Sequence, residues 1–220
     1  MFDVVFIFES GYTADHFSQK SKGKIGILKS GVLFKDHFDF GDSSEECVTC
    51  GKSKYIPAGK RCFGCQASMM AKHGAYLVPT LIAYDALDRN GKALGLGSAS
   101  MEKLQAVKAH GQTAISLCRE AGVKVGLGTD LLGGLQSDQS LGFRIQNEVD
   151  SNRDVLVSAT AVNAEILNQE NELGIVAAGA KADLLLVDGD PLADLALLER
   201  PDETLQVIMK NGDIYKNALS

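Results

Sequence analysis

The chain has 220 residues, of which 45% are hydrophobic and 23% are charged, and its net charge is −6. This composition is typical of a globular protein with a sizeable core, and the negative charge argues against a nucleic-acid binder that acts through bulk positive charge. No apolar stretch reaches the roughly 18 residues of a membrane span, and the N-terminus lacks the pattern of a secretory signal. We therefore expect a cytoplasmic protein that binds neither membranes nor nucleic acid.

Residues 1–65 form an atypical first segment without a clear helical period. The apolar run from Val4 to Phe8 predicts a short strand, and residues 25–28 are a second apolar run. An acidic stretch, residues 36–46, leads into a cluster of cysteines. We expect only a few short strands in this segment.

Four of the five cysteines are spaced as Cys47-x-x-Cys50 and Cys62-x-x-Cys65. Two such pairs offer four thiolates to one tetrahedral zinc ion, so the spacing predicts a structural zinc site on these four residues. The alternative is a pair of loops that carry reduced thiols or a redox-active dithiol. Cys118 stands alone in a helical pattern and is expected to be an inert core thiol.

From residue 66 the pattern becomes regular. A short helix is predicted over residues 67–72, a buried strand over 76–82, a long helix over 98–122 and a second strand over 123–127. Ser100 is the expected N-cap of the long helix and Gly122 its end.

Two further helices are predicted at residues 140–149 and 153–167, followed by a strand at 183–187. Residues 205–210 and 213–216 flank Asn211-Gly212, which is a strong signal for a β-hairpin. The order predicts an α/β fold with parallel strands over residues 66–170 and a small antiparallel β piece over residues 171–220.

Three motifs of the second part resemble the metal-dependent amidohydrolases, in particular their imidazolonepropionase-like and prolidase-like dipeptidase branch. They lie at residues 71–81, at 121–130, which end in Gly-Leu-Gly-Thr-Asp130, and at 159–191. The resemblance covers residues 66–217. It implies the late strands and helices of a TIM-like (β/α) barrel, followed by a piece of a β-sandwich. It also implies zinc-dependent hydrolysis of an amide C–N bond in a dipeptide-like or cyclic amide substrate, and the chain is a candidate homo-oligomer.

The same resemblance gives Asp130 a role. In the family, the aspartate after the eighth strand contacts the metal and moves a proton from the attacking water to the departing amine. The alternative is that Asp130 merely caps the following turn. Tyr84, Gln139 and Ser140 are the candidate substrate-binding residues, although a packing tyrosine and a solvated loop would explain them equally well.

The metal ligands of the family are largely missing from the sequence. Its four histidines are His16, His37, His73 and His110, and no His-x-His pair occurs. Residues 9–15 resemble the segment after the fifth barrel strand, which would place Ser10 at one metal-histidine position and Ser30 near another. Hydroxyls are poor zinc ligands. The second hypothesis is therefore a non-catalytic, zinc-stabilised paralogue that acts as an interaction module.

Overall fold

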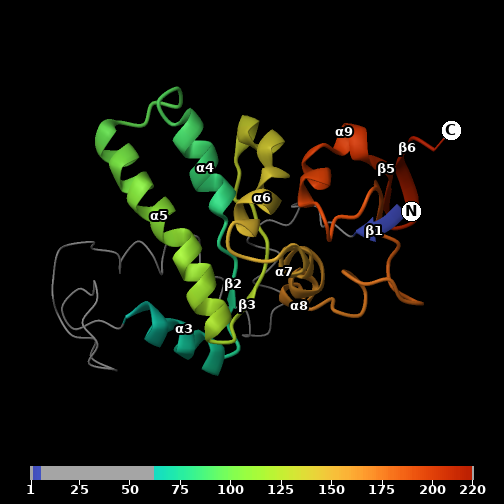
Figure 1. The fold of residues 1–220 in the computed structure, drawn as a ribbon, viewed down its shortest axis with the longest axis horizontal. Coiled ribbons are helices and arrows are strands. Elements are labelled where there is room, and N and C mark those ends of the chain that lie inside the picture. Colours follow the sequence, from blue (N-terminus) through green and yellow to red (C-terminus); the bar gives the residue numbers. More distant parts are fainter. Residues whose placement is uncertain (1, 6–61, 220) are drawn as a thin grey trace.

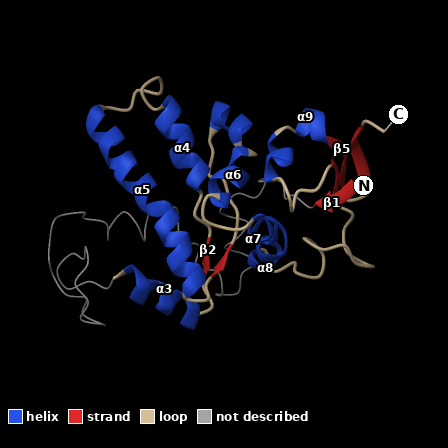
Figure 2. Ribbon diagram, in the orientation of Figure 1, coloured by secondary structure: helices blue, strands red, loops and turns tan. Residues whose placement is uncertain are grey.

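The computed structural model describes residues 2–5 and 62–219 of the chain. Three helices lie at one end of the molecule, a short parallel strand pair lies in the middle, and an antiparallel sheet lies at the other end (Figures 1 and 2). The expected strand at residues 4–8 overlaps this description only at its beginning. His16, His37, Cys47 and Cys50 lie outside the described residues.

The helical end consists of α3 (Phe63–Lys72), α4 (Leu81–Asn90) and α5 (Ser98–Glu120). The predicted short helix and long helix are both confirmed, but the predicted N-cap Ser100 is wrong. Gly97 is the N-cap because its backbone is extended (φ −72°, ψ 164°), whereas Ser100 already lies in the first helical turn. Gly122, in the left-handed region (φ +81°), follows the end of α5 as expected.

The parallel strands are β2 (Tyr76–Leu77) and β3 (Lys124–Val125), with Tyr76 paired to Lys124. Parallel pairing is confirmed, but both strands are shorter than the sequence predicts. Pro79 limits β2 because it has no N–H to donate to a ladder. Within residues 2–5 and 62–219 the parallel sheet has these two strands, so a closed barrel is not seen there.

The predicted helices after β3 are α6 (Leu141–Asn147) and a helical run from residue 152 to 166. That run consists of α7 (Asn152–Val157), a π-helical turn (Ser158–Val162) and α8 (Asn163–Ile166). The Ser151 hydroxyl caps its start by accepting a hydrogen bond from the Asp154 N–H at 3.1 Å.

The C-terminal sheet is antiparallel throughout, with the strand order β1-β4-β5-β6. Its strands are β1 (Phe2–Val5), β4 (Leu184–Asp188), β5 (Leu205–Lys210) and β6 (Asp213–Asn217). The predicted hairpin is confirmed, since Asn211 (φ +50°) and Gly212 (φ +89°) make its tight turn. A 3₁₀ turn (Leu195–Glu199) and α9 (Pro201–Thr204) lead into it.

The core consists of separate clusters that connect these parts. One cluster, which includes Leu77, Ile115 and Val125, packs the parallel strands against α3 and α5. A second, which includes Val155 and Val187, joins the helical run to the C-terminal sheet. Among the described residues, no helix is long and apolar enough to cross a membrane.

Candidate active site

Asp130 is exposed and lies in the loop that begins where the two parallel strands end. The strand itself ends at Val125, so the expectation that the strand runs up to Asp130 is wrong. The backbone nevertheless continues beside β2, because the Gly126 N–H donates to the Leu77 carbonyl at 2.8 Å. Asp130 thus follows the carboxyl end of a parallel strand, where the catalytic groups of barrel enzymes lie.

Glycine at position 128 allows the two chain segments to lie this close. A Cβ atom at Gly128 would lie 2.6 Å from Cγ1 of Val78, which no real structure tolerates. The Gly-Leu-Gly-Thr-Asp130 motif therefore supplies more than a carboxylate. Its glycine also allows the segment after β3 to pack against the segment after β2.

Two residues near this edge have left-handed backbones. Asp130 has φ +52° and Thr80, which precedes α4, has φ +45°. Aspartate adopts this conformation more readily than most residues, but a β-branched threonine there is a genuine outlier. Such backbone strain is concentrated at functional sites, because the surrounding structure must enforce it. Thr80 was not predicted from the sequence, because its only local signal is its place between Pro79 and a helix.

The structure brings Asp130 within electrostatic reach of Tyr84. Tyr84 lies near the start of α4, and its half-buried ring packs against the cluster around Leu77 and Ile115. Burial raises the pKa of the Tyr84 phenol, and the negative charge of Asp130 raises it further. At neutral pH the phenol is therefore neutral and can donate a hydrogen bond.

Leu131 packs the segment after Asp130 against α4. Its side chain is buried against Ile82 and Ala86 of α4, while the neighbouring Asp130 is exposed. The left-handed turn at Asp130 separates the two side chains in this way. The apolar contact of Leu131 with α4 therefore sets the distance between the carboxylate and the helix that carries Tyr84.

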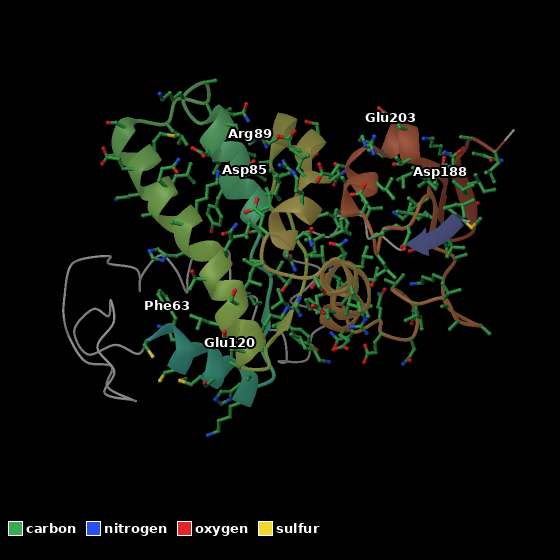
Figure 3. All side chains as sticks on the ribbon, in the orientation of Figure 1. Phe63, Asp85, Arg89, Glu120, Asp188 and Glu203 are labelled. Atoms are coloured by element: carbon green, nitrogen blue, oxygen red, sulfur yellow. The ribbon has the colours of Figure 1, made fainter. Side chains whose placement is uncertain are left out.

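The loop after Leu131 contains the other two candidate substrate residues. It includes a 3₁₀ turn (Gly133–Asp138), which is tied to α4 by an ion pair of 2.9 Å between Arg89 and Asp138. Arg89 also pairs with Asp85 on its own helix, and Figure 3 labels both side chains on α4. Gln139 is exposed and Ser140 is half-buried at the start of α6. Their contact with substrate stays a prediction.

The described residues do not form the metal site that the family resemblance implies. Among residues 2–5 and 62–219, no three His, Cys, Asp or Glu side chains gather in a way that could hold an ion. His73 is exposed at the end of α3, and His110 lies against Phe63 with ring centroids 6.4 Å apart. Asp130 alone is too small a ligand set for a catalytic metal, which needs about three protein ligands.

The second cysteine pair lies at the start of α3. Cys62 is the N-cap residue, with an extended backbone, and Cys65 lies in the first turn. Both side chains are half-buried. Cys118 is buried, as expected for a core thiol, and burial raises its pKa. Because the first pair lies outside the described residues, the zinc site on all four cysteines stays a prediction.

The sequence pattern of the amidohydrolase family matches residues 24–214, most of the chain. This chain belongs to the amidohydrolase family. The match begins well before residue 66, where the resemblance in the sequence analysis begins.

Proteins similar to this member of the family act on C–N bonds. A solved prolidase in complex with N-methylphosphonate-L-proline is 40% identical, with a TM-score of 0.66. A Xaa-Pro dipeptidase with methionine bound in its active site is 26% identical, with a TM-score of 0.60. A 5-methylthioadenosine/S-adenosylhomocysteine deaminase of Symbiobacterium thermophilum is 28% identical over 130 residues.

The chain spans only about a third of the length of these relatives. The match with the prolidase covers 70% of this chain and 38% of the prolidase. For the dipeptidase the shares are 69% and 37%, and for the deaminase they are 50% and 30%.

Proposed function

We propose that this chain forms the carboxylate-bearing part of a hydrolase that cleaves a C–N bond in a dipeptide-like or cyclic amide substrate. The observation that carries the proposal is the position of Asp130, which is exposed on a strained turn at the carboxyl end of a parallel strand pair. The prolidase and dipeptidase relatives support the substrate class. The deaminase relative supports the bond type, since hydrolytic deamination also cleaves a C–N bond with water.

In this proposal Asp130 is the proton carrier. Its carboxylate accepts a proton from water as the water oxygen bonds to the amide carbon. It then returns the proton to the nitrogen as the C–N bond breaks, so that one water is added in total. Tyr84, whose phenol is neutral and half-buried, is proposed to donate a hydrogen bond to a substrate oxygen. Gln139 and Ser140 are proposed to line the substrate side of the same loop.

Members of the family depend on a metal ion to activate the attacking water. Since residues 2–5 and 62–219 do not supply the ligands of this metal ion, we expect the ligands to come from other residues of the chain or from another chain. His16 and His37 are the imidazoles of the first segment. The 220-residue chain by itself is therefore expected to be a poor catalyst.

A chimera tests the proposed function directly. Residues 66–217 of this chain would replace the matching segment of the 40% identical prolidase, which supplies the remaining ligands. We expect the chimera to hydrolyse Xaa-Pro dipeptides and Asp130→Asn to lower its kcat at least about a hundredfold, because proton transfer contributes 10²–10⁴ in rate. Asp202→Asn, an exposed acid in α9, is the control. A folded, metal-loaded chimera without activity would refute the proposal.

We further propose the structural zinc ion on Cys47, Cys50, Cys62 and Cys65, which would also serve the alternative function as a zinc-stabilised interaction module. The positions of Cys62 and Cys65 support it, because both half-buried residues lie at the N-terminus of α3. Purified protein should contain one zinc per chain by elemental analysis, and Cys62→Ser with Cys65→Ser should remove it. Cys118→Ser, a change at the buried thiol, should not. Metal-free protein with four reactive thiols would support the dithiol interpretation instead.

A further inference from the structure

The amide side chain of Asn163 binds both backbone groups of Leu127. Nδ2 of Asn163 donates to the Leu127 carbonyl at 2.8 Å, and Oδ1 accepts from the Leu127 N–H at 3.2 Å. In a wider sheet these groups would pair with a neighbouring strand. Here the side chain of Asn163, at the start of α8, takes the place of that strand. Leu127, which it binds, lies three residues before Asp130.

A glycine makes this approach possible. A Cβ atom at Gly126 would lie 2.6 Å from Oδ1 of Asn163 and 2.8 Å from Cδ1 of Ile166. Contacts this short do not occur, so any side chain at position 126 would displace the amide. The glycine and the asparagine thus form one device, in which the first clears the space that the second fills.

The position of Asn163 in its helix is also unusual. It follows the π-helical turn Ser158–Val162. Such turns are rare in proteins overall, and those that occur often lie at functional sites. A second glycine, Gly174 (φ +73°), lies against this turn, since its Cβ would be 2.6 Å from the Thr160 carbonyl oxygen. The direction of Asn163 is therefore set by tertiary packing on both sides of the turn.

We propose that Asn163 is a positioning residue, which fixes the backbone of Leu127 and thereby the direction in which the following turn presents Asp130. This inference rests on the proposed function for its catalytic meaning. The segment after Leu127 needs such an anchor because Asp130 is strained and exposed, and strain persists only where the surroundings enforce it. Leu131 anchors the segment on its other side, against α4.

The test compares Asn163→Leu with Asn147→Leu in the 220-residue chain by NMR. Leucine has the branched shape of asparagine, with larger methyl groups in place of the amide oxygen and nitrogen, but its side chain makes no hydrogen bond. Asn147 is the control, because its side chain also makes two hydrogen bonds; its Nδ2 donates both, to the Asp150 carbonyl at 2.9 Å and to Oδ1 of Asn152 at 2.8 Å. In Asn163→Leu the exchange rate of the Leu127 amide should rise at least tenfold, and in Asn147→Leu it should not.

The decisive readout is the coupling between Asp130 and Tyr84. Asp130→Asn should shift the titration of the Tyr84 phenol in the wild-type and Asn147→Leu backgrounds. In Asn163→Leu, or in Gly126→Ala should that variant not fold, the shift should fall to less than half. An unchanged coupling in the folded variant would overturn the proposal, whatever the exchange rate. Neither readout needs turnover, so an inactive chimera would refute the proposed function without deciding this one.

Discussion

Asp130 and Tyr84 are linked at the level of single residues by charge and by burial. The ring of Tyr84 is packed against apolar side chains, and the carboxylate of Asp130 acts on its phenol from the neighbouring loop. Asp130 was predicted from the family motif and Tyr84 as a candidate substrate-binding residue, without a link between the two. Their proximity depends on Leu131, which is buried against α4 and which no motif singled out.

Replacing Asp130 by Asn should lower the pKa of Tyr84, although burial will keep it above the ordinary value. Asparagine tolerates a left-handed backbone as aspartate does, so the change removes the charge and leaves the turn. The measurement is a pH titration of the tyrosine ring carbons by NMR. Asp202→Asn is the control, and a Tyr84 titration that is the same in all three proteins would contradict the electrostatic link.

The same pKa shift predicts how stability depends on pH. Because the folded-state pKa of Tyr84 exceeds the unfolded value, its contribution is complete below about pH 10 and is lost as the pH rises through the folded-state pKa. Tyr84→Phe should therefore lose less stability than wild type between about pH 9 and pH 11. Urea unfolding at several pH values measures this, and equal slopes for the two proteins would argue against it.

At the level of elements, a polar network joins three helices behind the site. Arg119 of α5 donates to both carboxylate oxygens of Asp150, at 3.1 and 2.7 Å, and to the hydroxyl of Ser158 at 2.9 Å. Gln146 of α6 donates to the same Asp150 carboxylate at 3.0 Å. Asp150 is 8% exposed, so its charge depends on these partners.

Arg119→Met should reduce the free energy of unfolding by roughly 3 kcal/mol, because it leaves a buried carboxylate without its cation. Arg119→Met combined with Asp150→Asn should recover more than half of that loss, since the uncompensated charge is then gone. Arg153→Met serves as control, because Arg153 is 76% exposed and its ion pair is long, at 4.0 Å. Chemical denaturation at pH 7 gives all four values. Equal losses for Arg119→Met and Arg153→Met would show that the network does not stabilise the fold.

At the level of the whole molecule, the described residues combine a short parallel strand pair and its helices with a separate antiparallel sheet. The parallel strands deliver Asp130, but no metal-ligand group accompanies it within residues 2–5 and 62–219. The family match and the partial coverage of the relatives agree with this division.

The 220-residue chain should accordingly show little or no hydrolysis of Xaa-Pro, Xaa-Arg or hydrophobic dipeptides, even with added zinc. Asp130 can carry a proton, but a water without a metal keeps a pKa far above neutral. Each 1.36 kcal/mol lost from transition-state stabilisation costs about tenfold in rate. Product release by chromatography is the measurement. Metal-dependent turnover that disappears in Asp130→Asn would prove the expectation wrong, and would mean that a second copy or the first segment supplies the ligands.

The sequence by itself determined the elements whose signals are local. The long helix up to Gly122 follows from periodic apolar residues and a terminating glycine, and the hairpin follows from Asn211-Gly212. The family, too, was visible in motifs such as Gly-Leu-Gly-Thr-Asp130, and the family match confirms it.

Only the tertiary structure decided how these elements meet. The pairing of β1 with β4, the strained Thr80 and the hold of Asn163 on Leu127 join residues far apart in the chain or enforce a conformation that local preference opposes. Local propensity is encoded within a few residues, whereas such contacts depend on which surfaces the folded core brings together. The direction of Asp130 is therefore a property of the packed fold, although its identity as a candidate acid is a property of the sequence.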